Sequence, residues 1–110
     1  QPYIYLNQYL INELGLDQRT VEEAVAQEML KFKGVAAAVS GTALRSADLP
    51  ESMINTAVLK NAHSKRSGDI YLVFEQSVFI NDFDGLVVAS VHGSPWRYDT
   101  FVPVIFAGAD

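Results

Sequence analysis

The residues best suited to chemistry lie together near the C-terminus, in the sequence V-H-G-S-P-W-R-Y-D-T-F-V-P-V-I-F at positions 91–106. A histidine, small residues, an aromatic pair and an aspartate come directly before an apolar run, residues 102–106, whose β-branched and aromatic side chains predict a buried strand. Gly93 permits backbone angles that other residues avoid, and Pro95 fixes another angle. The pattern predicts that a loop beside a core strand holds His92 in a defined pose, as a metal ligand or general base requires.

This segment resembles the C-terminal metal-binding motif of the alkaline phosphatase superfamily, in particular its bacterial phosphatase and type I phosphodiesterase/nucleotide pyrophosphatase branches. There, H-G-S-x-x-x-Y-D-x-x-V-P supplies a zinc-ligating histidine just before a strand of the central sheet, and residues 92–103 match it. The family usually has a second histidine just before V-P, where this chain has Phe101. The family's upstream R-S-G-D segment is matched by residues 66–69, before the apolar run 70–74. Two motifs in the expected order indicate a resemblance that covers the whole chain.

The resemblance implies zinc-dependent hydrolysis of a phosphate monoester or diester, with one zinc ion beside an attacking threonine or serine and a second beside the leaving oxygen. It assigns His92 as a zinc ligand. It places the nucleophile and the other ligands upstream of Gln1, so no catalytic residue is assigned within this chain. Because a zinc site takes three or more protein ligands, we expect this chain to be the C-terminal part of a larger enzyme and inactive by itself. The resemblance also implies a periplasmic or secreted bacterial location.

Three residues close to His92 have two interpretations each. Asp99 is expected either to accept a hydrogen bond from the second imidazole nitrogen of His92, which would fix its tautomer, or to cap the entry to the following strand. Trp96 and Tyr98 either line the mouth of a substrate pocket or pack on the core, the commoner role of aromatic residues before a core strand. A nucleophilic pair of Ser94 and His92 is not favoured, because adjacent residues of an extended loop seldom face each other.

Other polar residues give weaker signals. His63 lies in the polar loop 61–67, where we expect an exposed side chain, and the basic cluster at 60–66 is expected to be a solvated loop. Asp82 and Asp84 resemble half of a calcium-binding loop, but no further oxygen ligands follow at regular offsets.

The elements that must position the motif follow from hydrophobic periodicity. Residues 2–7 predict a first strand, and residues 8–16 a short strand or a helical turn. The best-marked element is a helix that Asp17 or Thr20 can cap and that Gly34 ends. Apolar residues at every third or fourth position predict its buried stripe, and its charged and amide residues are expected to face water. The stripe comprises Val21, Ala24, Val25, Met29 and Phe32, and the solvated face comprises Glu22, Glu23, Gln27 and Lys31.

The remaining elements are shorter. Residues 35–40 predict a strand, residues 42–48 a polar loop, and residues 49–51 the opening of a second helix. The buried face of that helix is predicted to comprise Met53, Ile54, Ala57 and Val58. Residues 69–75 predict a strand that residues 77–80 either extend or follow as a second strand, residues 81–85 a turn, and residues 86–90 a strand leading to His92.

This order predicts an α+β fold close to a ferredoxin-like α/β sandwich (βαβαβ), with both helices on one face of an antiparallel or mixed sheet. Residues 1–80 are expected to form an inserted α/β subdomain. Residues 81–110 are expected to return to the larger alkaline-phosphatase-like core and to carry the H-G-S motif. Because the other strands of that core would be missing, we expect this segment to be disordered or packed differently.

Composition limits the classes of partner. The 110 residues carry a net charge of −5, with a pI of about 4.8, which argues against nucleic acid, a partner bound by clustered lysine and arginine. No apolar run approaches the roughly 20 residues of a membrane span. The absence of cysteine excludes disulfides and cysteine zinc sites. A phosphate ester is the expected substrate of the intact enzyme, and an uncovered apolar sheet face would favour self-association of this chain.

A different class of function also fits the order of elements. A stand-alone ferredoxin-like module would bind a small molecule or regulate a partner without catalysis. This alternative predicts that residues 86–110 complete a self-contained sheet and that the chain has no affinity for metal.

Overall fold

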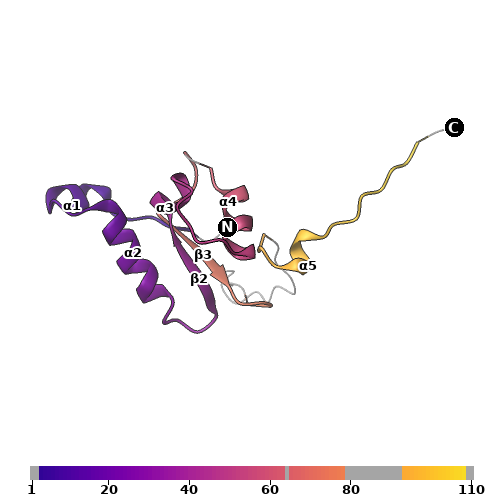
Figure 1. Ribbon diagram of the computed structural model, residues 1–110, viewed down its shortest axis with the longest axis horizontal. Helices are drawn as coiled ribbons and strands as arrows, with labels where there is room; N and C mark the ends of the chain where they lie inside the picture. Colours follow the sequence, from indigo (N-terminus) through magenta and orange to yellow (C-terminus); the bar gives the residue numbers. More distant parts are fainter. Residues whose placement is uncertain (1–2, 64, 79–92, 109–110) are drawn as a thin grey trace, which may run out of the picture.

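The structure is a computed structural model that describes residues 3–63, 65–78 and 93–108, and it combines helices with a small antiparallel sheet (Figure 1). The elements in chain order are β1 (Tyr3–Ile4), α1 (Gln8–Glu13), α2 (Gln18–Met29), β2 (Val35–Ser40), α3 (Gly41–Arg45), α4 (Met53–Asn61), β3 (Ile70–Phe74) and α5 (Arg97–Thr100). The predicted α+β class is confirmed. Of the two options for residues 8–16, the helical one is correct.

Strand β3 lies in the middle of the sheet. Within the described residues the strand order is β1-β3-β2, and β3 runs antiparallel to both neighbours. Tyr71 pairs with Tyr3 on one side and with Val39 on the other. The register shifts between Val35 and Ala37, which marks a β-bulge in the edge strand β2.

Helices cover both faces of this sheet. Ile70 and Leu72 of β3 form one core cluster with Ala26 of α2. Tyr71 and Val73, which point to the opposite face, form the other cluster with Val39, Leu44 of α3 and Val58 of α4. Figure 1 accordingly shows α2 and α4 on opposite sides of β2 and β3. The expectation that both helices lie on one face is therefore wrong, and burial from two sides explains why β3 is apolar at every position.

Helix α2 begins where the sequence indicated, but its buried stripe is rotated. Asp17 is the N-cap, and its Oδ2 accepts from the Thr20 amide at 2.9 Å. Val25 and Met29 face the sheet as expected. Ala26, which was not predicted to lie on the stripe, also faces the sheet, and Glu22, predicted to face water, is fully buried. The series 22, 25, 26, 29 follows the spacing i, i+3, i+4, i+7, so geometry places Glu22 on the stripe whatever its polarity.

Two other members of the predicted stripe are exposed. Ala24 lies on the outer side of α2, and Phe32 follows the end of the helix at Met29, so it has left the helical stripe.

The region between β2 and β3 contains one helix that was not predicted. Residues 41–45 form α3 in the predicted loop 42–48, and the Ser40 hydroxyl caps α3 by accepting from the Ala43 amide at 3.1 Å. Helix α4 begins at Met53, after its N-cap Ser52. Val58 is buried as predicted, but Met53 is 90% exposed because it occupies the first turn, away from the sheet.

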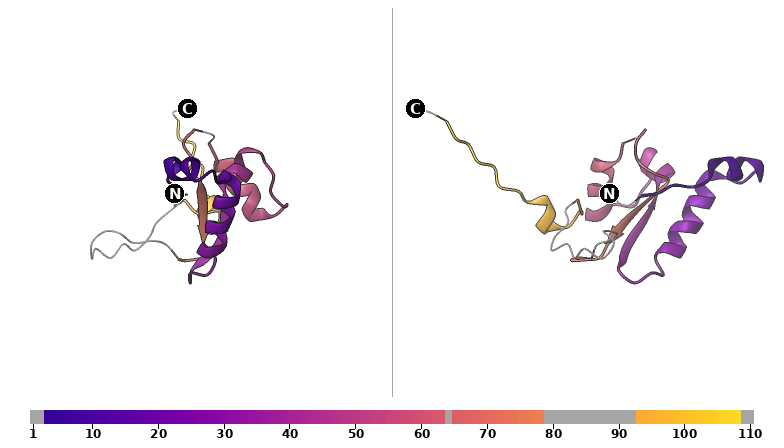
Figure 2. Two further views of the ribbon diagram at one scale, coloured as in Figure 1. Left: turned by 90° about the vertical axis from the view of Figure 1, so that its left-hand side faces the viewer. Right: turned by 180° about the vertical axis from the view of Figure 1, so that it is seen from behind.

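The predicted C-terminal strand does not form. Residues 101–108 are outside any helix or strand, and they run away from the body formed by α2, α4 and the sheet in Figures 1 and 2. Val102, Val104, Ile105 and Phe106 are 73–93% exposed. The expectation of a buried strand over residues 102–106 is wrong for this chain, because no neighbouring strand among the described residues pairs with it.

Several predictions fall outside the described residues. They are the turn 81–85, the strand 86–90, most of the extension 77–80, the half calcium loop at Asp82 and Asp84, and His92 itself.

Candidate functional site

The described part of the H-G-S motif begins immediately after His92. Gly93 has a φ of +103°, a left-handed conformation that strongly favours glycine. Gly93 thus adopts backbone angles that other residues avoid, as its position in the motif predicted. His92 lies outside the described residues, so its role as a zinc ligand stays a prediction.

Asp99 closes this loop on itself. Its Oδ2 atom accepts a hydrogen bond from the Ser94 amide at 2.9 Å and a second, short one from the Ser94 hydroxyl. Charge-assisted bonds of this kind are stronger than neutral ones. Asp99 thus holds Ser94, which lies two positions after His92 in the chain. Its predicted bond to the imidazole stays a prediction.

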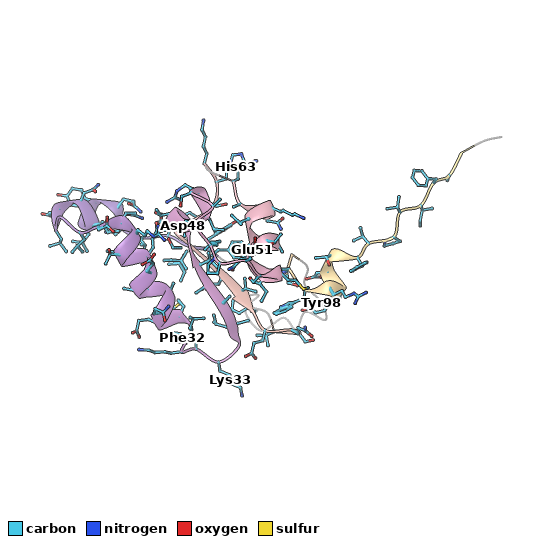
Figure 3. All side chains as sticks on the ribbon, in the orientation of Figure 1. Phe32, Lys33, Asp48, Glu51, His63 and Tyr98 are labelled. Atoms are coloured by element: carbon cyan, nitrogen blue, oxygen red, sulfur yellow. The ribbon has the colours of Figure 1, made fainter. Side chains whose placement is uncertain are left out.

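The two aromatic residues of the motif bind the loop to the end of β3 and to the turn after it. The indole Nε1 of Trp96 donates to the carbonyl oxygen of Phe74 at 2.7 Å, and its ring packs on the core cluster of Tyr71 and Val73. The hydroxyl of Tyr98 accepts from the Ser77 amide at 3.0 Å. Figure 3 shows Tyr98 where α5 meets the end of the sheet. Of the two roles considered for Trp96, packing on the core is confirmed.

The upstream R-S-G-D segment is a structural junction. Asp69 Oδ2 accepts from the Leu6 amide at 2.7 Å, and the Asp69 amide donates to the Ile4 carbonyl at 2.9 Å. Ser67 Oγ lies 3.1 Å from the hydroxyl of Tyr3. Gly68 allows this close approach, since a Cβ atom there would lie 2.6 Å from the Cβ of Tyr3. The segment joins β1 to β3, and the side chains of Ser67 and Asp69 are used in that contact.

The buried Glu22 carboxylate is the polar centre that the sequence analysis missed. Its Oε2 accepts from Ser40 Oγ at 2.5 Å and from the Thr42 amide at 2.8 Å. Its Oε1 accepts from Gln18 Nε2 at 2.8 Å, from Thr42 Oγ1 at 3.1 Å and from Arg45 Nη2 at 3.5 Å. These donors come from α2, the end of β2 and α3, so one carboxylate holds three elements together.

Two opposing effects act on the Glu22 pKa. Burial raises it, but the hydrogen bonds from Ser40, Thr42 and Gln18 together outweigh burial and hold the pKa below its usual range. The carboxylate is therefore ionised at neutral pH and fully occupied as an acceptor. That arrangement suits a structural role, because a catalytic base needs a free lone pair directed at substrate.

The remaining surface of the described residues offers a shallow hollow. The hollow, about 360 Å³ in volume, lies between α3, α4 and the loop after α4, with Arg45, His63 and Ser67 in its lining. His63 is exposed, as expected, and lies at the tip of its loop, far from Tyr98 (Figure 3). Over residues 3–63, 65–78 and 93–108, no three metal-ligating side chains gather into one group. Nor does any helix in these ranges have the length and apolar character to cross a membrane.

Comparison of the chain with family models, with curated proteins and with solved structures gave no match. The motif and its geometry are therefore the features of the chain that bear on its function.

Proposed function

We propose that this chain is the C-terminal part of a zinc-dependent phosphohydrolase of the alkaline phosphatase type, acting on a phosphate monoester or diester, with His92 as one zinc ligand. In this proposal the chain contributes one zinc ligand to a site whose other ligands lie elsewhere in the enzyme, because the described residues hold no metal cluster of their own. Zinc, when bound by the complete set of ligands, would polarise the phosphate ester. The chain alone is proposed to be inactive.

One observation supports the proposal: the loop of the H-G-S motif is held against the body, whereas the apolar segment after it pairs with no strand among the described residues. The loop 93–99 is fastened by Asp99, Trp96 and Tyr98. The apolar segment that follows it is exposed along residues 101–106. A self-contained module would bury such a segment in its own sheet. Exposure fits a strand whose neighbours belong to another part of a larger protein.

We propose that the body made by residues 3–78 is the inserted subdomain. Strands β1 and β2 flank the antiparallel β3, which is the split β-α-β arrangement that ferredoxin-like folds contain. Helices α3 and α4 on the second face depart from that fold. The ferredoxin-like likeness is therefore proposed for β1, α2, β2 and β3 alone.

The test uses the longer polypeptide that carries these residues, assayed with a chromogenic phosphate ester and measured for bound zinc. His92→Ala is expected to abolish zinc-dependent hydrolysis and to lower the zinc content. His63→Ala is the matched control, because it removes the other histidine of the chain, and it is expected to retain both. The 110-residue chain alone is expected to be inactive. Full activity in His92→Ala would overturn the proposal.

If the natural product begins near Gln1 and shows no zinc-dependent hydrolysis, the stand-alone binding or regulatory module is the better interpretation. Periplasmic or secreted location, also part of the proposal, is tested by fractionating cells that produce the longer protein.

A further inference from the structure

We propose that Trp96 and Tyr98 are positioning residues: they dock the loop 93–99 onto the end of β3 and the turn after it, and so hold the residues that directly follow His92 against the sheet. The docking is inferred from the hydrogen bonds of Trp96 and Tyr98. That it helps to orient a zinc ligand rests on the proposed function, in which His92 is that ligand.

The surface that receives the loop is itself held by backbone hydrogen bonds. The Glu75 amide donates to the Gly34 carbonyl at 2.8 Å, just before β2, and the Val78 amide donates to the Glu75 carbonyl at 3.1 Å. Ser77, between them, has a φ of +62°. A non-glycine residue seldom adopts this conformation unless surrounding contacts impose it. The end of β3 therefore presents the Phe74 carbonyl, and the turn presents the Ser77 amide, in defined directions.

The loop meets this surface with two side chains on one short helical turn. The Trp96 carbonyl accepts from the Asp99 amide at 3.0 Å and from the Thr100 amide at 3.2 Å, which places Trp96 at the start of α5. The Trp96 indole and the Tyr98 hydroxyl then reach Phe74 and Ser77, 22 and 21 residues earlier in the chain. These two bonds, together with the hydrogen bonds from Ser94 to Asp99, restrict both translation and rotation of the loop.

The two residues contribute in different ways. The Trp96 ring packs on the cluster that contains Val58, so it supplies apolar contact as well as a donor. Tyr98 is 54% exposed and gains little from burial, so its bond to Ser77 is its main contact with the turn. Removing only the Tyr98 hydroxyl therefore tests the docking bond with little change in packing.

The first experiment uses the 110-residue chain, whose single tryptophan reports directly on the docked indole. Tyr98→Phe is expected to speed exchange of the Ser77 amide by up to about tenfold, the effect of losing one hydrogen bond, and to increase acrylamide quenching of Trp96. Tyr9→Phe, at another exposed tyrosine, is the matched control and should change neither value. A wild-type Ser77 amide that exchanges as in an unfolded peptide, or no change in Tyr98→Phe, would overturn the docking.

The second experiment measures zinc affinity of the longer enzyme, without relying on its activity. Loss of groups that orient a ligand commonly lowers metal affinity about 10- to 100-fold, and Trp96→Phe and Tyr98→Phe are expected to do so. Unchanged affinity in both variants, with zinc lost in His92→Ala, would overturn the positioning role while leaving the proposed function intact. Zinc retained in His92→Ala would overturn the proposed function and with it the positioning role, whereas the docking is judged on the 110-residue chain alone.

Discussion

Glu22 is the residue on which the packing of α2 against β2 and α3 depends most directly. Its side chain is buried and accepts five hydrogen bonds. Glu22→Gln keeps the size but turns an amide group toward donors, so some of them lose their acceptor. We expect a loss of about 2–4 kcal/mol in the free energy of unfolding, measured by urea denaturation. Glu23→Gln, on the exposed side of the same helix, should change stability by less than about 0.5 kcal/mol. Equal effects of the two variants would contradict this account.

The same carboxylate predicts a dependence of stability on pH. The folded-state pKa of Glu22 is lowered, so its contribution is present above the unfolded pKa, about 4.3, and is lost as pH falls through the folded value. The difference in unfolding free energy between wild type and Glu22→Gln should therefore shrink as pH decreases below about 5. The Asp17 pKa is also lowered, by hydrogen bonds from Thr20, but Asp17 is present in both chains and cancels. A difference that stays constant down to pH about 2 would exclude this linkage.

Gly68 controls how closely β1 approaches β3. A Cβ atom at Gly68 would lie 2.6 Å from the Cβ of Tyr3 and 3.0 Å from the carbonyl oxygen of Ile4. Because these atoms belong to backbone or lie next to it, they cannot move aside as a flexible side chain would. We expect Gly68→Ala to destabilise the fold by about 1–3 kcal/mol and to speed exchange of the Asp69 amide. Gly108→Ala meets open space and serves as the control. Unchanged Asp69 exchange in Gly68→Ala would show that β1 does not dock as described.

At the scale of elements, regular patterns were predictable and long-range partners were not. Strands β2 and β3 follow from short apolar runs bounded by glycine, turn or polar residues, and the start of α2 follows from Asp17. Helix α3 was missed because residues 41–45 are too few to show a periodic stripe. Its one local signal is Ser40, a residue well suited to the N-cap.

The burial of Glu22 shows why a site can escape sequence analysis. A glutamate on a helix usually faces solvent, because ionised groups are costly to bury. The cost is offset here by donors 18 to 23 residues later, Ser40, Thr42 and Arg45, and no local pattern connects them to α2. The regular spacing of 22 with 25, 26 and 29 was the available signal. In the loop of the H-G-S motif the unusual backbone angle of Gly93 was predicted, whereas the bond from the Ser94 amide to Asp99 was not.

At the scale of the whole molecule, the described residues divide into two parts. One is a body in which helices cover both faces of a sheet, and the other is an apolar tail, residues 102–108. The body closes around two core clusters, and α5 is fastened to it through Trp96. The tail contributes neither to these clusters nor to the sheet. The free energy of unfolding should therefore depend on the body, and self-association should depend on the tail.

Deletion of residues 102–110 tests this division. The cut retains Phe101, which bonds to the Arg97 carbonyl and lies under its guanidinium at 5.1 Å, so α5 keeps its C-terminal contacts. We expect the unfolding free energy to change by less than about 0.5 kcal/mol, because the deleted side chains that the structure describes are exposed. Sedimentation velocity should show weaker self-association, since an extended apolar segment with unpaired backbone groups promotes pairing between chains.

A double variant, Val104→Asp with Ile105→Asp, keeps the length of the tail and removes its apolar character. It should match the truncated chain in both measurements if hydrophobic pairing drives association. A truncated chain that is destabilised by several kcal/mol would show instead that the tail packs on the body in solution. In that case residues 102–106 complete the fold of this chain, and the stand-alone module becomes the better account of its function.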